Sequence, residues 1–154
     1  MRTLSLILLK LFDKMDSICS GSFLMVSNKN AMEAYMLMGV PKEDAKVMAD
    51  PANKTRYEVE VDGKQIRWQE NYPAAPKYNH IYNFKLGETV TVEKPIAMAI
   101  TTTKKNGRTF SCNFDIGEKQ SSCTVTFSHE GFTTNGKTGG MEYTIVFARK
   151  QPEV

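Results

Sequence analysis

The segment Gly21–Val40, GSFLMVSNKNAMEAYMLMGV, joins a strand pattern to a helix pattern near the start of the chain. Its first part alternates with a period of two, so that Phe23 and Met25 fall on one face of a strand. Ala31–Met38 then has the character of a short helix, and Gly39 supplies its end. One strand therefore leads directly into a helix.

Local signals mark the helix start and predict a second helix. Asn28 and Asn30 can cap the first turn, and Glu33 is placed where an acidic side chain favours that turn. Pro41 opens another start signal, because proline is tolerated in a first helical turn. We expect this second helix over Glu43–Ala49.

Nearly everything after Pro51 consists of short alternating segments and turns. Asp62-Gly63 and Asn106-Gly107 are strong two-residue hairpin signals. The expected strands are Lys54–Val61, Lys64–Tyr72, Tyr78–Phe84, Thr89–Glu93, Ala97–Lys105, Arg108–Asp115, Lys119–Ser128, Phe132–Lys137 and Met141–Arg149. Successive hairpins predict an all-β fold: a ten-stranded up-and-down antiparallel β-barrel that closes its own edges, with a two-helix lid between its first two strands.

The composition of the chain limits the kinds of function that it can have. The chain has 154 residues, which suits one domain, and its net charge of +3 is too small and too dispersed to indicate nucleic-acid binding. The three cysteines, Cys19, Cys112 and Cys123, have neither metal-ligand spacing nor a C-x-x-C motif. We expect reduced thiols in a reducing compartment, and no metal or cofactor.

The first residues are apolar without forming a full targeting signal. Arg2 followed by Leu4–Leu9 resembles the start of a secretory signal, but Lys10 interrupts the run, which is too short to span a membrane. We interpret Met1–Lys14 as an N-terminal extension and residues 15–154 as the barrel domain. A cytoplasmic location is expected, with secretion through this apolar segment as the alternative.

Two motifs carry a resemblance to a known family. The residues are Gly21, Phe23, Met25-Val26, Asn30 and Met38-Gly39-Val40 in the opening segment, and Asn83-Phe84-Lys85-Leu86-Gly87 at mid-chain. Together they resemble the intracellular lipid-binding proteins, the fatty-acid-binding protein family, over roughly Met15 to Lys150. Phe23 replaces the family's usual tryptophan, and Ala31 its usual phenylalanine. The resemblance implies a monomeric, non-enzymatic carrier that holds a small hydrophobic ligand inside the barrel.

The inward faces of the expected strands indicate a cavity. They carry tyrosine and tryptophan, which need hydrogen-bond partners when buried, and one acid, Glu70, whose burial in a dry core would be costly. A partly apolar cavity accommodates these side chains better than a filled barrel, which is the alternative. The candidate ligand-binding residues are Tyr57, Trp68, Glu70, Tyr72, His80, Tyr82, Phe84, Thr124, Thr126, Tyr143, Ile145 and Phe147.

The resemblance also implies an anion clamp that this chain does not match. Many relatives grip a carboxylate with an arginine on the eighth strand and an Arg-x-Tyr motif on the last. Those positions fall near Thr124 or Thr126 and on or beside Ile145-Val146-Phe147, where no arginine occurs. A neutral ligand, such as a sterol-like lipid or a retinoid alcohol, fits better than a fully buried fatty acid. Alternatively, an acid could bind with its head at the mouth.

The remaining candidates concern catalysis and ligand entry. His80 near Glu70 could form an acid–base pair, but no nucleophile is placed with them, so we interpret His80 as a cavity liner and the protein as no enzyme. The resemblance implies that the helices form a portal, with Tyr35, Met36 and Met38 on the lid and a transient membrane contact through it. The alternative function is a secreted or structural barrel that acts by surface contacts and binds no ligand tightly.

Overall fold

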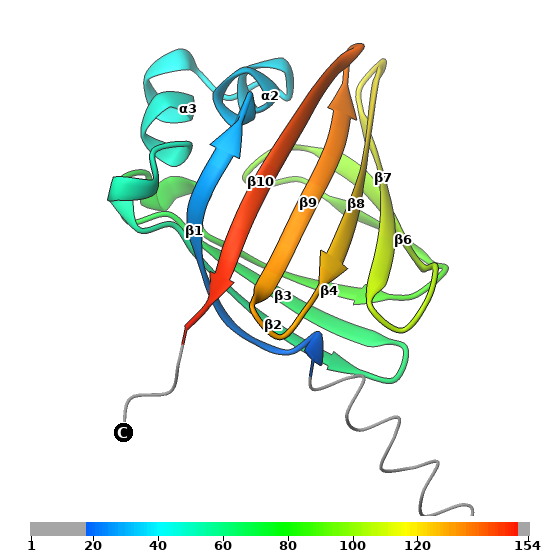
Figure 1. Cartoon of the computed structure of the whole chain (residues 1–154). Coiled ribbons are helices and arrows are strands. Elements are labelled where there is room, and N and C mark those ends of the chain that lie inside the picture. The colour runs from blue at the N-terminus through cyan, green and yellow to red at the C-terminus, as the bar shows by residue number, and fades with distance from the viewer. Residues whose placement is uncertain (1–17, 151–154) are drawn as a thin grey trace, which may run out of the picture.

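Ten antiparallel strands wrap around a common interior, and two short helices cover one end of it (Figure 1). The computed structural model describes residues 18–150. The elements are β1 (Gly21–Lys29), α2 (Ala31–Leu37), α3 (Lys42–Met48), η1 (Pro51–Asn53), β2 (Arg56–Asp62), β3 (Gln65–Asn71), η2 (Pro76–Tyr78), β4 (His80–Lys85), β5 (Thr89–Val92), β6 (Met98–Lys104), β7 (Thr109–Ile116), β8 (Lys119–Phe127), β9 (Gly131–Thr138) and β10 (Met141–Arg149). The predicted fold class is confirmed, while the extension Met1–Lys14 lies outside the described residues.

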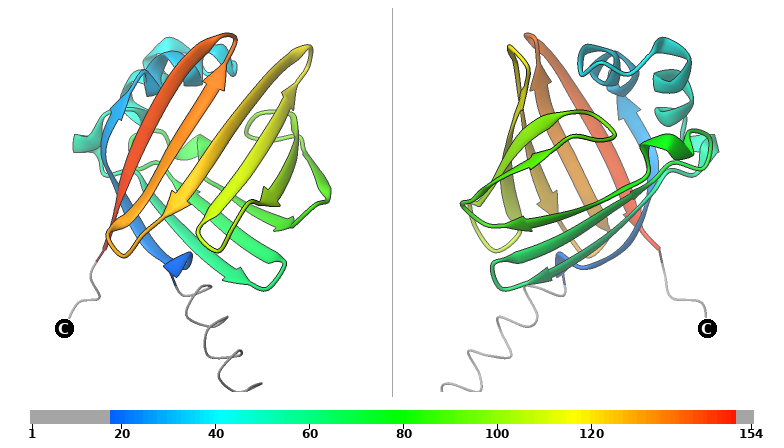
Figure 2. Two further views of the ribbon diagram at one scale, coloured as in Figure 1. Left: turned by 45° about the vertical axis from the view of Figure 1, so that its right-hand side comes forward. Right: turned by 180° about the vertical axis from the view of Figure 1, so that it is seen from behind.

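The strands form one sheet in the order β4-β3-β2-β1-β10-β9-β8-β7-β6-β5. Consecutive strands pair antiparallel from β1 to β4 and from β5 to β10, and the pairing of β1 with β10 joins the first and last strands. Within residues 18–150, however, the ladder does not pair β4 with β5, so the expectation that the barrel closes its own edges is wrong. The backbone N–H of Gly87, in the turn after β4, instead donates to the carbonyl of Thr102 on β6 at 2.8 Å. The barrel is therefore nearly closed, with one open seam (Figure 2).

β1 has the alternation that the sequence predicts. Phe23 and Met25 are buried, whereas Val26 on the other face is 49% exposed. The pairing with β10 shifts register between Met25 and Ser27. Such a bulge bends a strand, and here it lies where β1 has left β2 and continues along β10.

The two helices follow β1 as expected, and of the two candidate asparagines only Asn28 caps the first helix with its side chain. The side chain of Asn28 accepts a hydrogen bond from the backbone N–H of Ala31 at 3.3 Å. Asn30, in the left-handed conformation, makes no side-chain cap and donates instead to the carbonyl of Glu142 on β10 at 3.0 Å. Asn28 therefore supplies the cap, and Asn30 fastens the helix to the barrel. Within residues 18–150, no helix has the length and apolarity needed to cross a membrane.

Aromatic rings fill the barrel at the end away from the helices. Phe132 stacks on Phe147 with ring centroids 4.5 Å apart, and Phe23 meets Phe132 edge-on at 4.9 Å. Arg149 lies over the Phe23 ring at 4.8 Å and donates to the backbone carbonyls of Ile18, Ser20, Ser128 and His129. This aromatic plug closes the bottom of the barrel, and the open space lies between it and the helices.

Candidate ligand cavity

A cavity of about 170 Å³ lies inside the barrel, between the aromatic plug and the helices. Since a water needs about 10–15 Å³ of such space, it has room for about a dozen waters. The interior is therefore not packed solid. The walls come from α2, α3 and most of the strands, together with Pro95 and Ile96 in the loop before β6.

Most of the sequence-predicted binding residues meet around this cavity. Those that line it are Tyr57, Trp68, Glu70, Tyr72, Tyr82, Phe84, Tyr143, Ile145 and Phe147. Of the portal residues, Tyr35 and Met38 line the cavity, whereas Met36 does not and is 39% exposed. The placement of these side chains follows from the period of two in the strands and from the helix face that meets the barrel.

Three predicted residues lie elsewhere. Thr124 is half-buried and Thr126 exposed, because the inward face of β8 carries Cys123, Val125 and Phe127. A shift of one residue moves a strand position to the opposite face, so placing the eighth-strand site on the threonines was wrong. His80 is also outside the lining, and its ring packs against Tyr82 with centroids 4.5 Å apart.

Several lining residues were missed by the sequence analysis. They are Ala34, Val40, Met48, Val59, Val61, Ile66, Tyr78, Met98, Ile100, Thr102, Phe110, Cys112, Phe114, Cys123, Val125, Phe127 and Thr134, besides the loop residues above. The alternation of Phe110, Cys112 and Phe114 was a usable signal. It indicated one face of a strand, but it did not show which face was inward.

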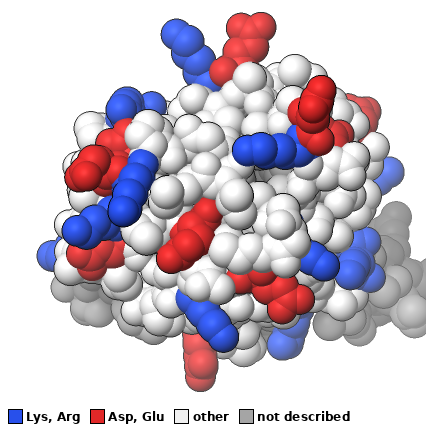
Figure 3. All heavy atoms as spheres, turned by 90° about the horizontal axis from the view of Figure 1, so that it is seen from above, with Lys and Arg blue, Asp and Glu red and all other residues white. Residues whose placement is uncertain are grey.

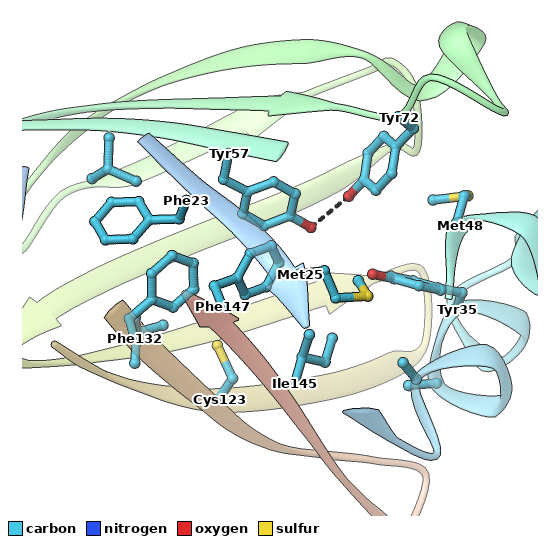
Figure 4. Close-up of a cluster of buried hydrophobic side chains, with 14 of the residues drawn as sticks. Phe23, Met25, Tyr35, Met48, Tyr57, Tyr72, Cys123, Phe132, Ile145 and Phe147 are labelled. Atoms are coloured by element: carbon cyan, nitrogen blue, oxygen red, sulfur yellow. Dashed lines mark hydrogen bonds between the residues drawn. The ribbon is translucent and has the colours of Figure 1, made fainter. Parts of the chain in front are cut away.

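A chain of hydrogen bonds runs along one wall of the cavity. Trp68 Nε1 donates to Glu70 Oε2 at 2.8 Å, and the Tyr72 hydroxyl donates to Glu70 Oε1 at 2.6 Å. The Tyr57 and Tyr72 hydroxyl oxygens are 2.6 Å apart, and the dashed line in Figure 4 marks the hydrogen bond between them. Because the single proton of Tyr72 is used toward Glu70, Tyr57 donates to Tyr72. The carboxylate thus has an aromatic donor on each oxygen.

The electrostatics of the wall are set by burial. Removal from water raises the pKa of Glu70, although the hydrogen bonds from Tyr72 and Trp68 act in the opposite direction. Burial, and then the negative charge of Glu70, raise the pKa of Tyr57 and of Tyr35 well above the usual tyrosine range. The hydroxyl of Tyr35 is buried close enough to those of Tyr57 and Tyr72 for them to influence its pKa, but it has no partner among residues 18–150 at hydrogen-bond geometry.

The described residues that line the cavity include one carboxylate, that of Glu70, and no lysine, arginine or histidine. Within residues 18–150, no three His, Cys, Asp or Glu side chains are grouped as a metal ion would require. The arrangement is an aromatic and aliphatic pocket with a hydrogen-bond acceptor on one wall, which is a geometry for binding an amphiphile.

Solved structures share this architecture. The Schistosoma mansoni fatty acid binding protein in complex with arachidonic acid superposes with a TM-score of 0.76 at 12% identity, covering 89% of this chain and 99% of that one. The chain has the fold of the intracellular lipid-binding proteins. Apo Caenorhabditis elegans lipid binding protein 8 gives a TM-score of 0.73 at 17% identity, with 87% of this chain and 96% of that chain covered.

The REP1-NXSQ fatty acid transporter also has the intracellular lipid-binding protein fold, with a TM-score of 0.74 at 15% identity over 87% of this chain and 97% of that one. No family model matches the sequence, and no curated protein matches it. At these identities the similarity concerns the fold, so the function has to be argued from the cavity itself.

Proposed function

We propose that this protein is a non-enzymatic intracellular carrier that holds one small hydrophobic ligand, a lipid, inside the barrel. The observation that carries the proposal is the cavity of about 170 Å³, enclosed by aromatic and aliphatic side chains beneath two helices. A carrier needs no chemical step. Burial of the ligand's apolar body contributes about 25 cal/mol per Å² removed from water, before the costs of association.

The ligand that this cavity favours is neutral. Among the described residues that line the cavity, Glu70 is the single charged group, and a buried anionic head would lie near it without a cation from these residues to balance it. An alcohol or amide could donate a hydrogen bond to Glu70 and accept one from Tyr35, whose hydroxyl has no hydrogen-bond partner among the described residues. A fatty acid would be accommodated only with its head at the mouth.

Entry is proposed to occur between the helices and the loop after β3. Tyr78 in that loop donates to Asp44 on α3 at 3.0 Å, and Lys77 forms an ion pair with the same carboxylate at 2.8 Å. These contacts tie the loop to the lid. This hydrogen bond and this ion pair lie near solvent, where breaking them takes little free energy. The helices would also make the transient membrane contact.

The surface above the helices does not suggest a nucleic-acid partner. Basic and acidic side chains are interspersed over the end of the molecule seen in Figure 3, where they form no patch of a single sign. We therefore propose that the partner is a small ligand and not a nucleic acid.

Extraction of the purified protein with organic solvent, followed by mass spectrometry, tests the proposal. A stoichiometric neutral lipid should be recovered, and the delipidated protein should bind a fluorescent lipid probe. Val125→Trp, which fills the cavity, should abolish probe binding, and Thr126→Trp on the outer face of β8 should not. Melting curves of both variants establish that they fold. A stable protein that is empty and ignores lipid probes would instead support a secreted or structural barrel acting by surface contacts.

A further inference from the structure

A row of paired residues crosses five neighbouring strands on the inner wall, and four of the five carry a thiol or a hydroxyl group. Thr102 of β6 pairs with Cys112 of β7, which pairs with Cys123 of β8. Cys123 pairs in turn with Gly136 of β9, and Gly136 with Tyr143 of β10. Apart from Gly136, all members of the row line the cavity. Two thiols therefore lie side by side between two hydroxyl groups, and Figure 4 shows Cys123 pointing into the interior.

The two thiols are placed for a disulfide and do not form one. Directly opposed residues in antiparallel strands have Cα atoms about 4.5 or 5.5 Å apart, depending on the type of pair. Both values fall within the range of about 4.4–6.8 Å that a disulfide spans. Cys112 and Cys123 are free cysteines. The pairing of Cys112 with Cys123 therefore gives the Cα separation that a disulfide needs.

The neighbours of the thiols distinguish the two sulfurs. Cys112 is half-buried with its accessible side in the cavity, and its sulfur lies 3.6 Å from Oγ1 of Thr102. A hydrogen bond from Cys123 lowers the pKa of the Cys112 thiol, whereas the same contact, followed by burial, raises that of Cys123. Cys112 is the more accessible thiol and has the lower pKa, so it is the better placed of the two to attack, which leaves Cys123 as the resolving thiol.

Gly136 makes room for the phenol at the end of the row. A Cβ placed on Gly136 would overlap the ring and the hydroxyl oxygen of Tyr143, so the ring lies across β9 with its hydroxyl directed toward β8. Tyr143 and Thr102 thereby bring a hydroxyl group to each end of the thiol pair. Such groups can hydrogen-bond to the oxygen atoms of a bound ligand.

We propose that Cys112 and Cys123 reduce a hydroperoxide group on a lipid bound in the cavity, giving the lipid alcohol and an intramolecular disulfide. The inference rests on the proposed carrier function, because the peroxide has to enter as part of an apolar ligand. It adds to that function a reaction of the carried lipid, once per reduced chain, and a thiol reductant restores the starting state.

The reaction balances in two steps. The Cys112 thiolate attacks the terminal oxygen of the hydroperoxide, the O–O bond breaks, and the lipid alkoxide takes up the proton that Cys112 lost, which leaves Cys112 as a sulfenic acid. Cys123 then attacks the Cys112 sulfur, the S–O bond breaks, and the hydroxide leaves as water with the Cys123 proton. Two thiols have been oxidised to a disulfide, and the hydroperoxide has been reduced to an alcohol and water.

The test uses the full chain, delipidated and reduced, in which thiol titration under denaturing conditions should first give three free thiols. Linoleyl alcohol hydroperoxide is added at one equivalent, and hydrogen peroxide is added in a parallel sample. The lipid hydroperoxide should oxidise the pair more than about tenfold faster, because binding places it beside the thiols. Intact mass should show the loss of two hydrogens, peptide mapping a Cys112–Cys123 bond, and product analysis one lipid alcohol per chain.

Variants assign the roles of the thiols. Cys112→Ser should yield no lipid alcohol, whereas Cys123→Ser should yield it and leave a sulfenic acid on Cys112 that dimedone traps. Cys19→Ala is the matched control, because Cys19 donates to the carbonyl of Gly107, does not line the cavity, and should leave the reaction unchanged. Excess linoleyl alcohol should compete with the hydroperoxide and slow the reaction.

The outcomes separate this inference from the proposed function. Binding of a fluorescent lipid probe with no disulfide and no lipid alcohol would overturn the inference and leave the carrier intact. Absence of probe binding would overturn the carrier function. Equal rates with hydrogen peroxide and the lipid hydroperoxide, in a protein that binds the probe, would also overturn the inference, since the thiols would then react without regard to the bound lipid.

Discussion

Trp68 and Glu70 lie two positions apart on β3 and face the same cavity, where Trp68 Nε1 donates a hydrogen bond to Glu70 Oε2 at 2.8 Å. Trp68 is the single tryptophan of the chain. Its fluorescence therefore reports on the one acidic group of the lining, and a ligand that contacts Glu70 should change it. This pairing makes the preference of the site for a head group directly measurable.

The wild-type protein should bind a long-chain alcohol more than about tenfold more tightly than the fatty acid of the same length, which corresponds to about 1.4 kcal/mol or more. An acid head buried beside Glu70 meets a like charge, whereas an alcohol can donate to it. Glu70→Gln should narrow the difference by strengthening acid binding. Titration followed by Trp68 fluorescence measures both affinities.

Glu58→Gln is the matched control for this prediction, because Glu58 lies on the outer face of β2, where Arg56 is its ionic partner at 3.7 Å. It should leave the preference unchanged. Tight oleate binding that does not respond to Glu70→Gln would contradict the prediction and place the acid head at the mouth of the cavity.

Stability should decrease with rising pH through Glu70. Burial raises its pKa in the folded protein above the ordinary value of 4.5, so the folded state holds this proton more tightly than the unfolded state. The contribution of Glu70 is therefore most favourable below pH 4.5 and becomes unfavourable as the pH rises through the folded pKa. Urea unfolding of wild type and Glu70→Gln between pH 4.5 and 8 should show that the variant gains stability relative to wild type as the pH rises.

Glutamine suits this comparison because the network can reverse its polarity. Its oxygen can accept from Trp68 while its amide donates to the Tyr72 hydroxyl, which then donates to Tyr57. The pKa of Asp44 is lowered, chiefly by its hydrogen bond with Lys77, so its contribution to the pH dependence of stability has the opposite sign. This contribution is the same in wild type and in Glu70→Gln, and it therefore cancels when the two stabilities are subtracted. A difference that is constant with pH would contradict a raised pKa for Glu70.

The barrel could be predicted from the sequence because each strand has its own alternation and each turn its own signal. Phe23 and Met25 identify the inward face of β1 with no knowledge of any partner strand. The open seam could not be predicted this way, since pairing between β4 and β5 depends on how far the strands diverge after their turn. The backbone bond from Gly87 to Thr102 is a tertiary fact without a local signature.

The residues that line the cavity could also be predicted from the sequence only where a local signal marks them. The aromatic face of β3 was identified because Trp68 and Tyr72 stand out by residue type, whereas both faces of β8 carry small polar residues, which lie beside Val125 and Phe127 on the inward face only. There the inward set depends on register, and a choice of Thr126 over Val125 reverses the face. The pairing of Cys112 with Cys123 likewise becomes visible only when the register of β7 and β8 is known.

Arg149 should stabilise the closed end of the barrel. It lies over the Phe23 ring and donates to four backbone carbonyls, two before β1 and two in the turn between β8 and β9. Arg149→Met retains an unbranched side chain but removes these bonds, and we expect a loss of about 2–4 kcal/mol in the free energy of unfolding. Urea denaturation measures it. Arg108→Met is the control, because Arg108 is exposed between β6 and β7. It should lower the free energy of unfolding by less than about 0.5 kcal/mol. An equal loss in the two variants would contradict this role of Arg149.

A pair of truncations should locate the start of the folded unit. Removal of Met1–Lys14 is expected to leave the melting temperature nearly unchanged, because this segment lacks strand alternation and precedes the first residue that resembles the lipid-binding proteins. Removal of residues 1–20 should lower the melting temperature by several degrees, since it deletes the carbonyls of Ile18 and Ser20 that accept from Arg149. In an Arg149→Met background the two truncations should differ less, because those acceptors then have no guanidinium to bind. The remaining difference should reflect the loss of the buried Cys19 and of the hydrogen bond from the Val61 N–H to Ser20 Oγ. Thermal unfolding of the four proteins measures this coupling. A loss of several degrees on removing Met1–Lys14 alone would show that the extension is part of the folded domain.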